Sequence, residues 1–223
     1  PGFRRRVEWF VANRPHMVRH FERKGNSVLL AVATRDRLKR ILLRMFDSDE
    51  FLSLYGIRSL SKAHEDQPFE LEIDDNTYTV GYEPGEAVTP LYGGNSNWRG
   101  PVWLPVNYLL IGALEQYHKF YGNSFKIPCF DGKTKQITLK QAAQQLRRRL
   151  VKLFVPDKQG RRPSHQDFRQ HNRKGFDQLI LFHEYFHGDT GRGLGSIHQQ
   201  GWTALVAPLL EQMVEENEKD DQA

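Results

Sequence analysis

The chain has 223 residues, of which 39% are hydrophobic and 12% aromatic, and its formal net charge is +5. This composition supports a sizeable core and excludes wholesale disorder, and no apolar run reaches the roughly 18 residues of a membrane helix. The single cysteine, Cys129, excludes an internal disulfide and fits a reducing, cytoplasmic location. Basic residues alternate with acidic ones and form no known nucleic-acid module, so we expect neither a nucleic-acid nor a membrane partner.

The first half of the chain predicts two amphipathic helices and one β-hairpin. Apolar residues at helical spacing predict a helix over residues 3–13 and another that follows the N-cap candidate Thr34 to about residue 46. Alternating apolar residues predict a hairpin over residues 69–82, with its turn at residues 74–76.

The second half predicts four more helices, separated by long loops. The helix over residues 103–121 is apolar nearly all round, so we expect it to be buried on most faces. Thr138 and Gln141 form a capping-box pattern for the next helix, in which Arg147 to Arg149 are expected to point mostly outward. A short helix over residues 176–186 and a last helix over residues 200–216 complete the set.

A zinc-protease pattern, His183-Glu184-x-x-His187, lies at the end of the expected short helix. On a helix the two histidines would face the same way, and Glu184 could act as a general base on a zinc-bound water. The extended pattern requires Gly at 190 and His at 193, where this chain has Thr190 and Gly193. A zinc metallohydrolase is therefore the least favoured alternative, and Glu184 is interpreted as a single acid–base carboxylate facing a glycine loop.

A second group of residues has the chemistry that sugar binding needs. The run around Trp98, Arg99 and Trp103 places a guanidinium between two indoles, and Asn107 follows one helical turn later. An aromatic face stacks on the apolar face of a sugar ring, while Arg and Asn offer fixed hydrogen bonds to its hydroxyl groups. The two tryptophans could equally anchor the loop in the core.

Three separated motifs resemble glycoside hydrolase family 63, which contains processing α-glucosidases and their bacterial relatives. The resemblance covers about residues 35–210. The motifs are Tyr55-Gly56-Ile57-Arg58-Ser59-Leu60; Gly94-Asn95-Ser96-Asn97-Trp98-Arg99-Gly100-Pro101-Val102-Trp103 with Asn107-Tyr108; and Glu184-Tyr185 followed by Asp189-Thr190-Gly191-x-Gly193 and Gly201-Trp202-Thr203.

The resemblance implies a mainly α fold, the C-terminal portion of an (α/α)6 toroid with one β-hairpin insertion, and hydrolysis of α-glucosidic or related α-linked bonds with inversion. It implies that Glu184 is the general base and that neither a metal nor a cofactor takes part. The implied substrate-binding residues are Arg58, Trp98, Arg99, Gly100, Trp103, Asn107, Tyr185 and Trp202.

The family's general acid is an Asp that lies upstream of all these motifs, and none of Asp47, Asp49, Asp74 or Asp75 stands in such a motif. We therefore expect residues 1–223 to be the C-terminal portion of a single catalytic domain, inactive alone. The expected partners are an oligosaccharide or glucoside and the N-terminal half of the same domain. The competing hypothesis is a non-catalytic helical module that binds sugars or a protein partner.

Overall fold

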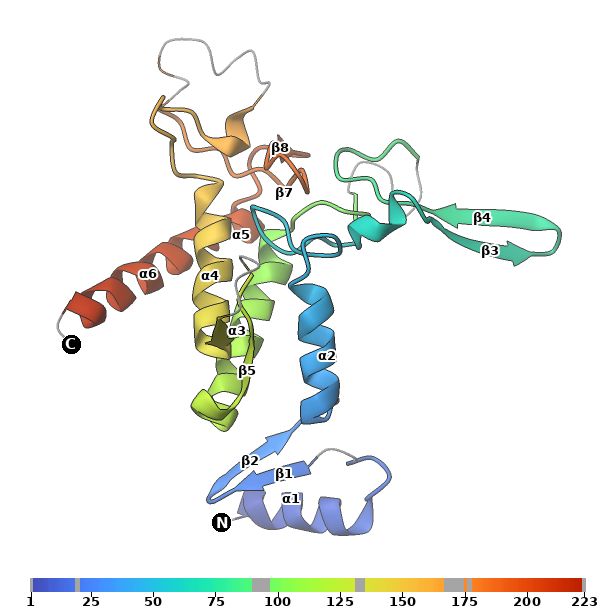
Figure 1. The fold of residues 1–223 in the computed structure, drawn as a ribbon, viewed down its shortest axis with the longest axis vertical. Coiled ribbons are helices and arrows are strands. Elements are labelled where there is room, and N and C mark those ends of the chain that lie inside the picture. Colours follow the sequence, from blue (N-terminus) through green and yellow to red (C-terminus); the bar gives the residue numbers. More distant parts are fainter. Residues whose placement is uncertain are drawn as a thin grey trace.

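The computed structural model describes residues 2–18, 21–89, 97–130, 135–166, 175 and 178–221. Two helices at its centre, α3 (Leu104–Tyr121) and α4 (Leu139–Lys152), pack side by side. Figure 1 shows α6 (Val206–Asp221) leaving this pair on one side and the hairpin of β3 (Phe69–Ile73) and β4 (Asn76–Val80) projecting on the other. The site described below lies at the end of the α3–α4 pair where these parts meet.

The N-terminal elements lie at the opposite end of the molecule from the β7–β8 pair. Helix α1 (Gly2–Asn13) runs beside the antiparallel strands β1 (Phe21–Lys24) and β2 (Ser27–Leu30), and α2 (Arg35–Met45) connects them with the centre (Figure 1). The expected helices at residues 3–13 and 34–46 are thus confirmed. The hydroxyl of Thr34 accepts a hydrogen bond from the Arg37 N–H at 3.3 Å, as its N-cap role requires.

The core is formed mainly by the facing sides of α3 and α4. The capping box is confirmed, because the Thr138 hydroxyl accepts from the Gln141 N–H while the Gln141 side chain accepts from the Thr138 N–H. The most buried apolar side chains of the pair are Leu104, Ile111, Leu114, Leu139, Ala142, Ala143, Leu146 and Leu150. Helix α3 is less enclosed than expected, since Leu109 is 72% exposed and the described residues cover only part of its surface.

Four two-stranded antiparallel sheets are present in the described residues, where the sequence predicted one hairpin. The predicted one is β3–β4, and Asp74 and Asp75 in its turn both have the positive φ that a tight hairpin turn requires. The others are β1–β2, β5 (Lys126–Pro128) with β6 (Gln136–Thr138), and β7 (Tyr185–Phe186) with β8 (Gly193–Leu194). Strands of two to four residues give too little alternation to be recognised in a sequence.

The expected helix over residues 176–186 is wrong. Residues 176 and 177 lie outside the described part, and residues 178–186 contain no helix and end in β7. Their backbone groups bond to distant segments: the Glu184 N–H donates to the Ser196 carbonyl at 2.8 Å, and the Phe186 N–H donates to the Val102 carbonyl at 3.0 Å. These tertiary hydrogen bonds replace those of a helix.

The last helix is also interrupted. A short helix, α5 (Gln200–Thr203), ends before α6 begins at Val206. Pro208 explains the break, because it lacks the N–H that would bond to the Ala204 carbonyl and its ring would clash with that carbonyl. Three short 3-10 turns, Lys62–His64, Gly122–Ser124 and Pro163–His165, complete the elements.

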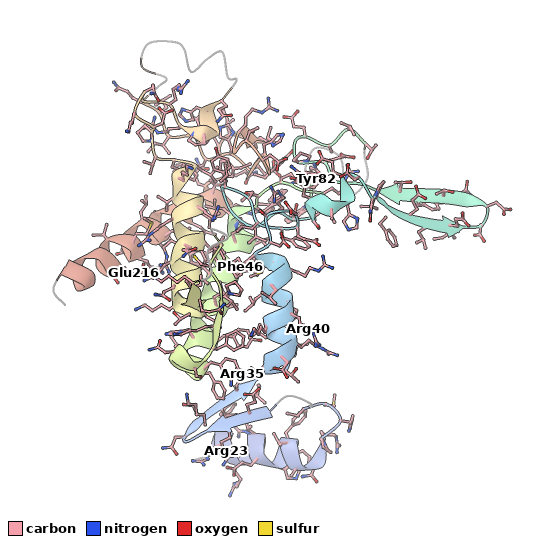
Figure 2. All side chains as sticks on the ribbon, viewed as in Figure 1. Arg23, Arg35, Arg40, Phe46, Tyr82 and Glu216 are labelled. Carbon is pink, nitrogen blue, oxygen red and sulfur yellow. The ribbon has the colours of Figure 1, made fainter. Side chains whose placement is uncertain are left out.

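Arg147 points inward, contrary to the expectation that it faces solvent. Its guanidinium is 1% exposed and contacts Glu115 of α3 at 2.5 Å and Glu216 of α6 at 2.8 Å. Figure 2 shows Glu216 on α6 beside α4. Arg147 therefore connects three helices through one buried guanidinium that pairs with two partly exposed carboxylates. None of the helices in the described ranges is both long enough and apolar enough to traverse a bilayer.

Candidate active site

The three sequence motifs meet through backbone hydrogen bonds. The Val102 N–H donates to the Phe186 carbonyl at 2.8 Å, and Val102 also forms an isolated antiparallel bridge with Arg58. The Ser59 N–H donates to the Pro101 carbonyl at 3.0 Å. Segments that are far apart in the chain thus lie in one row, and we call residues 55–61, 97–103 and 183–196 the site segments.

Four rings from these segments and from α5 form an aromatic cluster: Trp98, Trp103, Tyr185 and Trp202. Trp103 is buried at its centre, with Trp98 stacked on it at 3.9 Å between ring centroids and Tyr185 at 4.8 Å. Trp202 is tilted against Trp103 at 5.3 Å. Because Trp98 is 40% and Trp202 39% exposed, the cluster presents aromatic surface on which a sugar ring could stack.

Glu184 lies beside this cluster and is only partly buried. Its Oε2 accepts a hydrogen bond from the Ser196 N–H at 3.2 Å, in addition to the backbone bond between the two residues. Gly195 has a φ of +66°, and a Cβ there would lie 2.7 Å from Glu184 Oε2 and 2.9 Å from the Tyr185 ring. The glycine thus allows the backbone to hold the carboxylate against the aromatic cluster.

The hydroxyl of Tyr185, in the aromatic cluster, is affected by the charges of two carboxylates. Its side chain is fully buried, and the backbone of Asn97 hydrogen-bonds to its hydroxyl. The pKa of this hydroxyl is raised to about 12, first by burial and then by the negative charges of Glu86 and Glu184. The hydroxyl therefore keeps its proton at neutral pH, and the charges of both carboxylates act on it.

Arg99 and Gly100, predicted to bind substrate, have structural roles in this conformation. The Arg99 guanidinium is 4% exposed, pairs with the Glu83 carboxylate at 2.7 Å and donates to the Thr89 hydroxyl at 2.9 Å. Gly100 has a φ of +139°, and a Cβ there would lie 2.6 Å from the Tyr82 ring. Both residues hold the loop that carries Trp98.

Asn107 and Arg58 are likewise buried and hydrogen-bonded within the protein. The Asn107 amide is completely buried: it accepts from the Ile57 N–H at 2.7 Å and donates to the carbonyls of Ile57 and Trp103. The Arg58 guanidinium donates to the Leu52 carbonyl and to Asp189 at 2.8 Å, and Asp189 also accepts from the Tyr82 hydroxyl at 3.1 Å. These groups join the site segments to one another.

The two histidines of the zinc pattern also pack or hydrogen-bond within the site segments. His183 is fully buried, and a Cβ on Gly193 would overlap its ring. His187 Nδ1 accepts from the backbone N–H groups of Asp189 and Thr190 at 3.2 and 3.4 Å. The helix on which the zinc hypothesis depended does not form, and among the described residues no three His, Cys, Asp or Glu side chains are placed to hold a metal ion.

Sequence reasoning missed two residues of the site, Asn97 and Glu86. Asn97 is 1% exposed, and its side-chain amide donates to the backbone carbonyls of Glu83 and Gly85 while its backbone carbonyl accepts from the Trp103 indole at 2.9 Å. Asn97 stands in the second motif, next to Trp98, but the motif gave it no role of its own. Glu86 gave no sequence signal, because it lies in a long loop whose path depends on these hydrogen bonds.

Comparison with known proteins agrees with a carbohydrate-active site. Over 217 residues the chain is 46% identical to the uncharacterized protein YMR196W of Saccharomyces cerevisiae, an alignment that includes 92% of this chain and 20% of the relative. It is 25% identical over 181 residues to a probable mannosyl-oligosaccharide glucosidase of Schizosaccharomyces pombe. It is 24% identical over 175 residues to the mannosyl-oligosaccharide glucosidase of S. cerevisiae.

The alignments with the two glucosidases include 81% and 78% of this chain, and the chain spans only 15 to 20% of the length of the three relatives. The model of one protein family matches residues 17–203, which contain all three site segments and α5. The chain belongs to the mannosylglycerate hydrolase MGH1-like glycoside hydrolase family.

Proposed function

We propose that this chain carries the general base of an inverting glycoside hydrolase that acts on α-glucosidic or related α-linked bonds. The observation that carries the proposal is the position of Glu184. A partly exposed carboxylate, oriented by the Ser196 N–H, stands at the edge of an aromatic cluster with exposed ring faces. A sugar stacked on those rings would bring its anomeric carbon close to that carboxylate.

In an inverting mechanism one carboxylate removes a proton from water while a carboxylic acid on the opposite face of the sugar protonates the leaving oxygen. The two groups stand about 6.5–9.5 Å apart, which leaves room for the water. We assign the first role to Glu184. We further propose that the acid comes from a part of the protein outside residues 1–223, which is consistent with relatives about five times longer than the chain.

The same relatives support the remaining parts of the proposal. The two glucosidases favour an α-glucosidic bond, while the family description names mannosylglycerate and so extends the expected substrates to α-mannosides. We propose that α2, α3, α4 and α6 belong to an (α/α)6 toroid of glycoside hydrolase family 63 type, completed by the rest of the protein. In it Arg58, Arg99 and Asn107 position the loops, while Trp98 and Trp202 contact the sugar.

The test is a Glu184→Gln variant of the longer protein, which removes the base but keeps the side chain's size. We expect kcat for α-glucosyl and α-mannosyl substrates to fall at least about a hundredfold, because general base catalysis contributes that much or more. Sugar binding, followed by tryptophan fluorescence, should persist. Glu211→Gln on the exposed face of α6 is the matched control and should leave kcat unchanged.

Two outcomes would contradict the assignment. Near-normal turnover in Glu184→Gln would show that another group activates the water. The anomer released first, followed by NMR, tests the stereochemistry: an inverting enzyme releases the β-sugar from an α-glycoside, so an initial α-sugar would refute inversion.

A further inference from the structure

Glu86, which neither the sequence motifs nor the family match singles out, follows a segment that the site segments fix in place. From one side, the Asn97 amide donates to the carbonyls of Glu83 at 2.7 Å and Gly85 at 2.8 Å. The Arg99 guanidinium pairs with the Glu83 carboxylate, and the Glu83 N–H donates to the Arg99 carbonyl at 2.6 Å. The backbone that leads into Glu86 is therefore held by the same loop that carries Trp98.

The other side of this segment is held by the loop that follows Glu184. The Gly188 N–H donates to the Pro84 carbonyl at 2.9 Å. Gly85 packs against the His187 ring, where an added Cβ would lie 3.4 Å from Cδ2. Two independent site segments thus fix the chain just before Glu86, whose own side chain is exposed to solvent.

The same Asn97 whose side chain holds Gly85 accepts a hydrogen bond from the Trp103 indole through its backbone carbonyl at 2.9 Å, so Glu86 directly follows a residue that is fixed to the aromatic cluster. The charge of Glu86 acts on the hydroxyl of Tyr185, the ring that stacks on Trp103, and so does the charge of Glu184. An ionised carboxylate offers only hydrogen-bond acceptors, and the hydroxyl groups around the edge of a sugar ring are donors. Such bonds to a charged acceptor are among the stronger ones in proteins.

We propose that Glu86 is a substrate-binding residue, which accepts hydrogen bonds from hydroxyl groups of the sugar ring that stacks on the aromatic cluster. Trp98 and Trp202 would recognise the face of the sugar, while Glu86 recognises its edge and so determines which hydroxyl pattern fits. Its role is binding rather than proton transfer. This inference rests on the proposed function, because it assumes that the aromatic cluster holds a sugar.

The experiment uses Glu86→Ala and Glu86→Gln in the longer protein, with α-D-glucosyl fluoride as substrate and D-glucose as binding probe. Fluoride is a good leaving group that needs little protonation, so the assay separates binding from acid catalysis. We expect Glu86→Ala to raise both KM and the Kd for D-glucose about tenfold or more while kcat stays within about threefold, with a smaller effect for Glu86→Gln. Glu70→Ala, at an exposed carboxylate on β3, should change neither.

Deoxy sugars identify the hydroxyl group concerned. The deoxyglucose that lacks the group bound by Glu86 should bind the unchanged protein about as weakly as D-glucose binds Glu86→Ala, and the variant should weaken its binding no further. The proposal is overturned if Kd and KM stay within twofold of the unchanged protein, or if kcat falls a hundredfold at constant KM.

The measurement of sugar binding also separates the proposed hydrolase function from the proposed role of Glu86. A protein that binds D-glucose but hydrolyses no α-linked sugar would refute the proposed function, and the Kd values would still decide the role of Glu86. A protein that binds neither glucose nor mannose would refute both.

Discussion

The site segments and the N-terminal region, residues 2–18 and 21–30, are built in opposite ways. In the site segments, buried polar groups such as Arg58, Asn97 and Asn107 hold loops with little regular structure. The N-terminal region has a helix and a hairpin, yet α1 contains no buried residue. Large apolar side chains, including Phe3, Trp9 and Met17, are exposed there.

This difference shows that burial does not follow regular secondary structure in the described residues. The N-terminal region is tied to the centre by a few contacts, among them the hydrogen bond from the Tyr121 hydroxyl to Glu22 at 3.0 Å and the packing of Leu29 on the core. An apolar cavity of about 440 Å³ remains open between α1 and the residues after β2. The family match begins at residue 17, so α1 lies outside it and the site segments lie inside it.

The largest effect on stability is expected from Gly193→Ala. The new methyl group would overlap the buried His183 ring, which has no room to move, so we expect a loss of about 3 kcal/mol or more in the free energy of unfolding. The matched change in the N-terminal region is Gly25→Ala, where φ is +57° but no atom lies within 4 Å of the added carbon. It should cost only about 1 kcal/mol. Urea denaturation measures both, and equal losses would contradict the comparison.

A smaller loss is expected from Asn107→Ala. The change leaves the buried N–H and carbonyl of Ile57 without their side-chain partner, which should cost about 2 kcal/mol. Asn13 makes one exposed hydrogen bond, to the Trp9 carbonyl, so Asn13→Ala should change stability by less than about 0.5 kcal/mol. If the two variants unfolded at the same urea concentration, the buried amide would not be what joins the site segments.

The smallest effect is a pH dependence from His187. Burial lowers the pKa of its imidazole from 6.5, Arg192 lowers it further and Asp189 opposes both, so the folded state favours the neutral ring that accepts two backbone N–H groups. Below about pH 6.5 the unfolded chain takes up a proton first, so this stabilisation is present at neutral pH and is lost as the pH falls through the folded-state pKa.

The measurement is the urea midpoint at pH 7.5 and at pH 5. His187→Asn keeps an acceptor that does not titrate, and the decrease in midpoint between the two pH values should therefore become smaller. His16→Gln, at an exposed histidine of the N-terminal region, should leave the decrease as it is. An unchanged decrease in His187→Asn would show that other groups cause the pH dependence.

Local signals in the sequence were sufficient where a structure is local. The N-cap of α2, the capping box of α4 and the turn of β3–β4 depend on residues three or four apart, and all were confirmed. The helix prediction for residues 176–186 failed because the apolar spacing suits a helix, while the N–H groups of Glu184 and Phe186 bond to Ser196 and Val102, outside the segment. The prediction that Arg147 faces solvent failed for a similar reason, since its side chain is buried only because α3 and α6 pack beside α4.

The site was predicted in part. The structure brings Trp98, Trp103, Tyr185 and Trp202 together beside Glu184, as the motifs suggested. In contrast, the side chains of Arg58, Arg99 and Asn107 form hydrogen bonds with other groups of the protein. The type of a residue alone does not tell whether its hydrogen-bond partner is a sugar or a backbone carbonyl.

The backbone pairing of Val102 with both Arg58 and Phe186 has a consequence for the order of events during synthesis. A ribosome releases the chain from its N-terminus, so Trp103 is exposed to water until Tyr185 and Trp202 have emerged to cover it. Long-range contacts of this kind form slowly, because a long loop must close first. Trp103, which is 1% exposed in the finished site, is therefore open to solvent for part of synthesis, and a chaperone that binds aromatic segments could bind it in that interval.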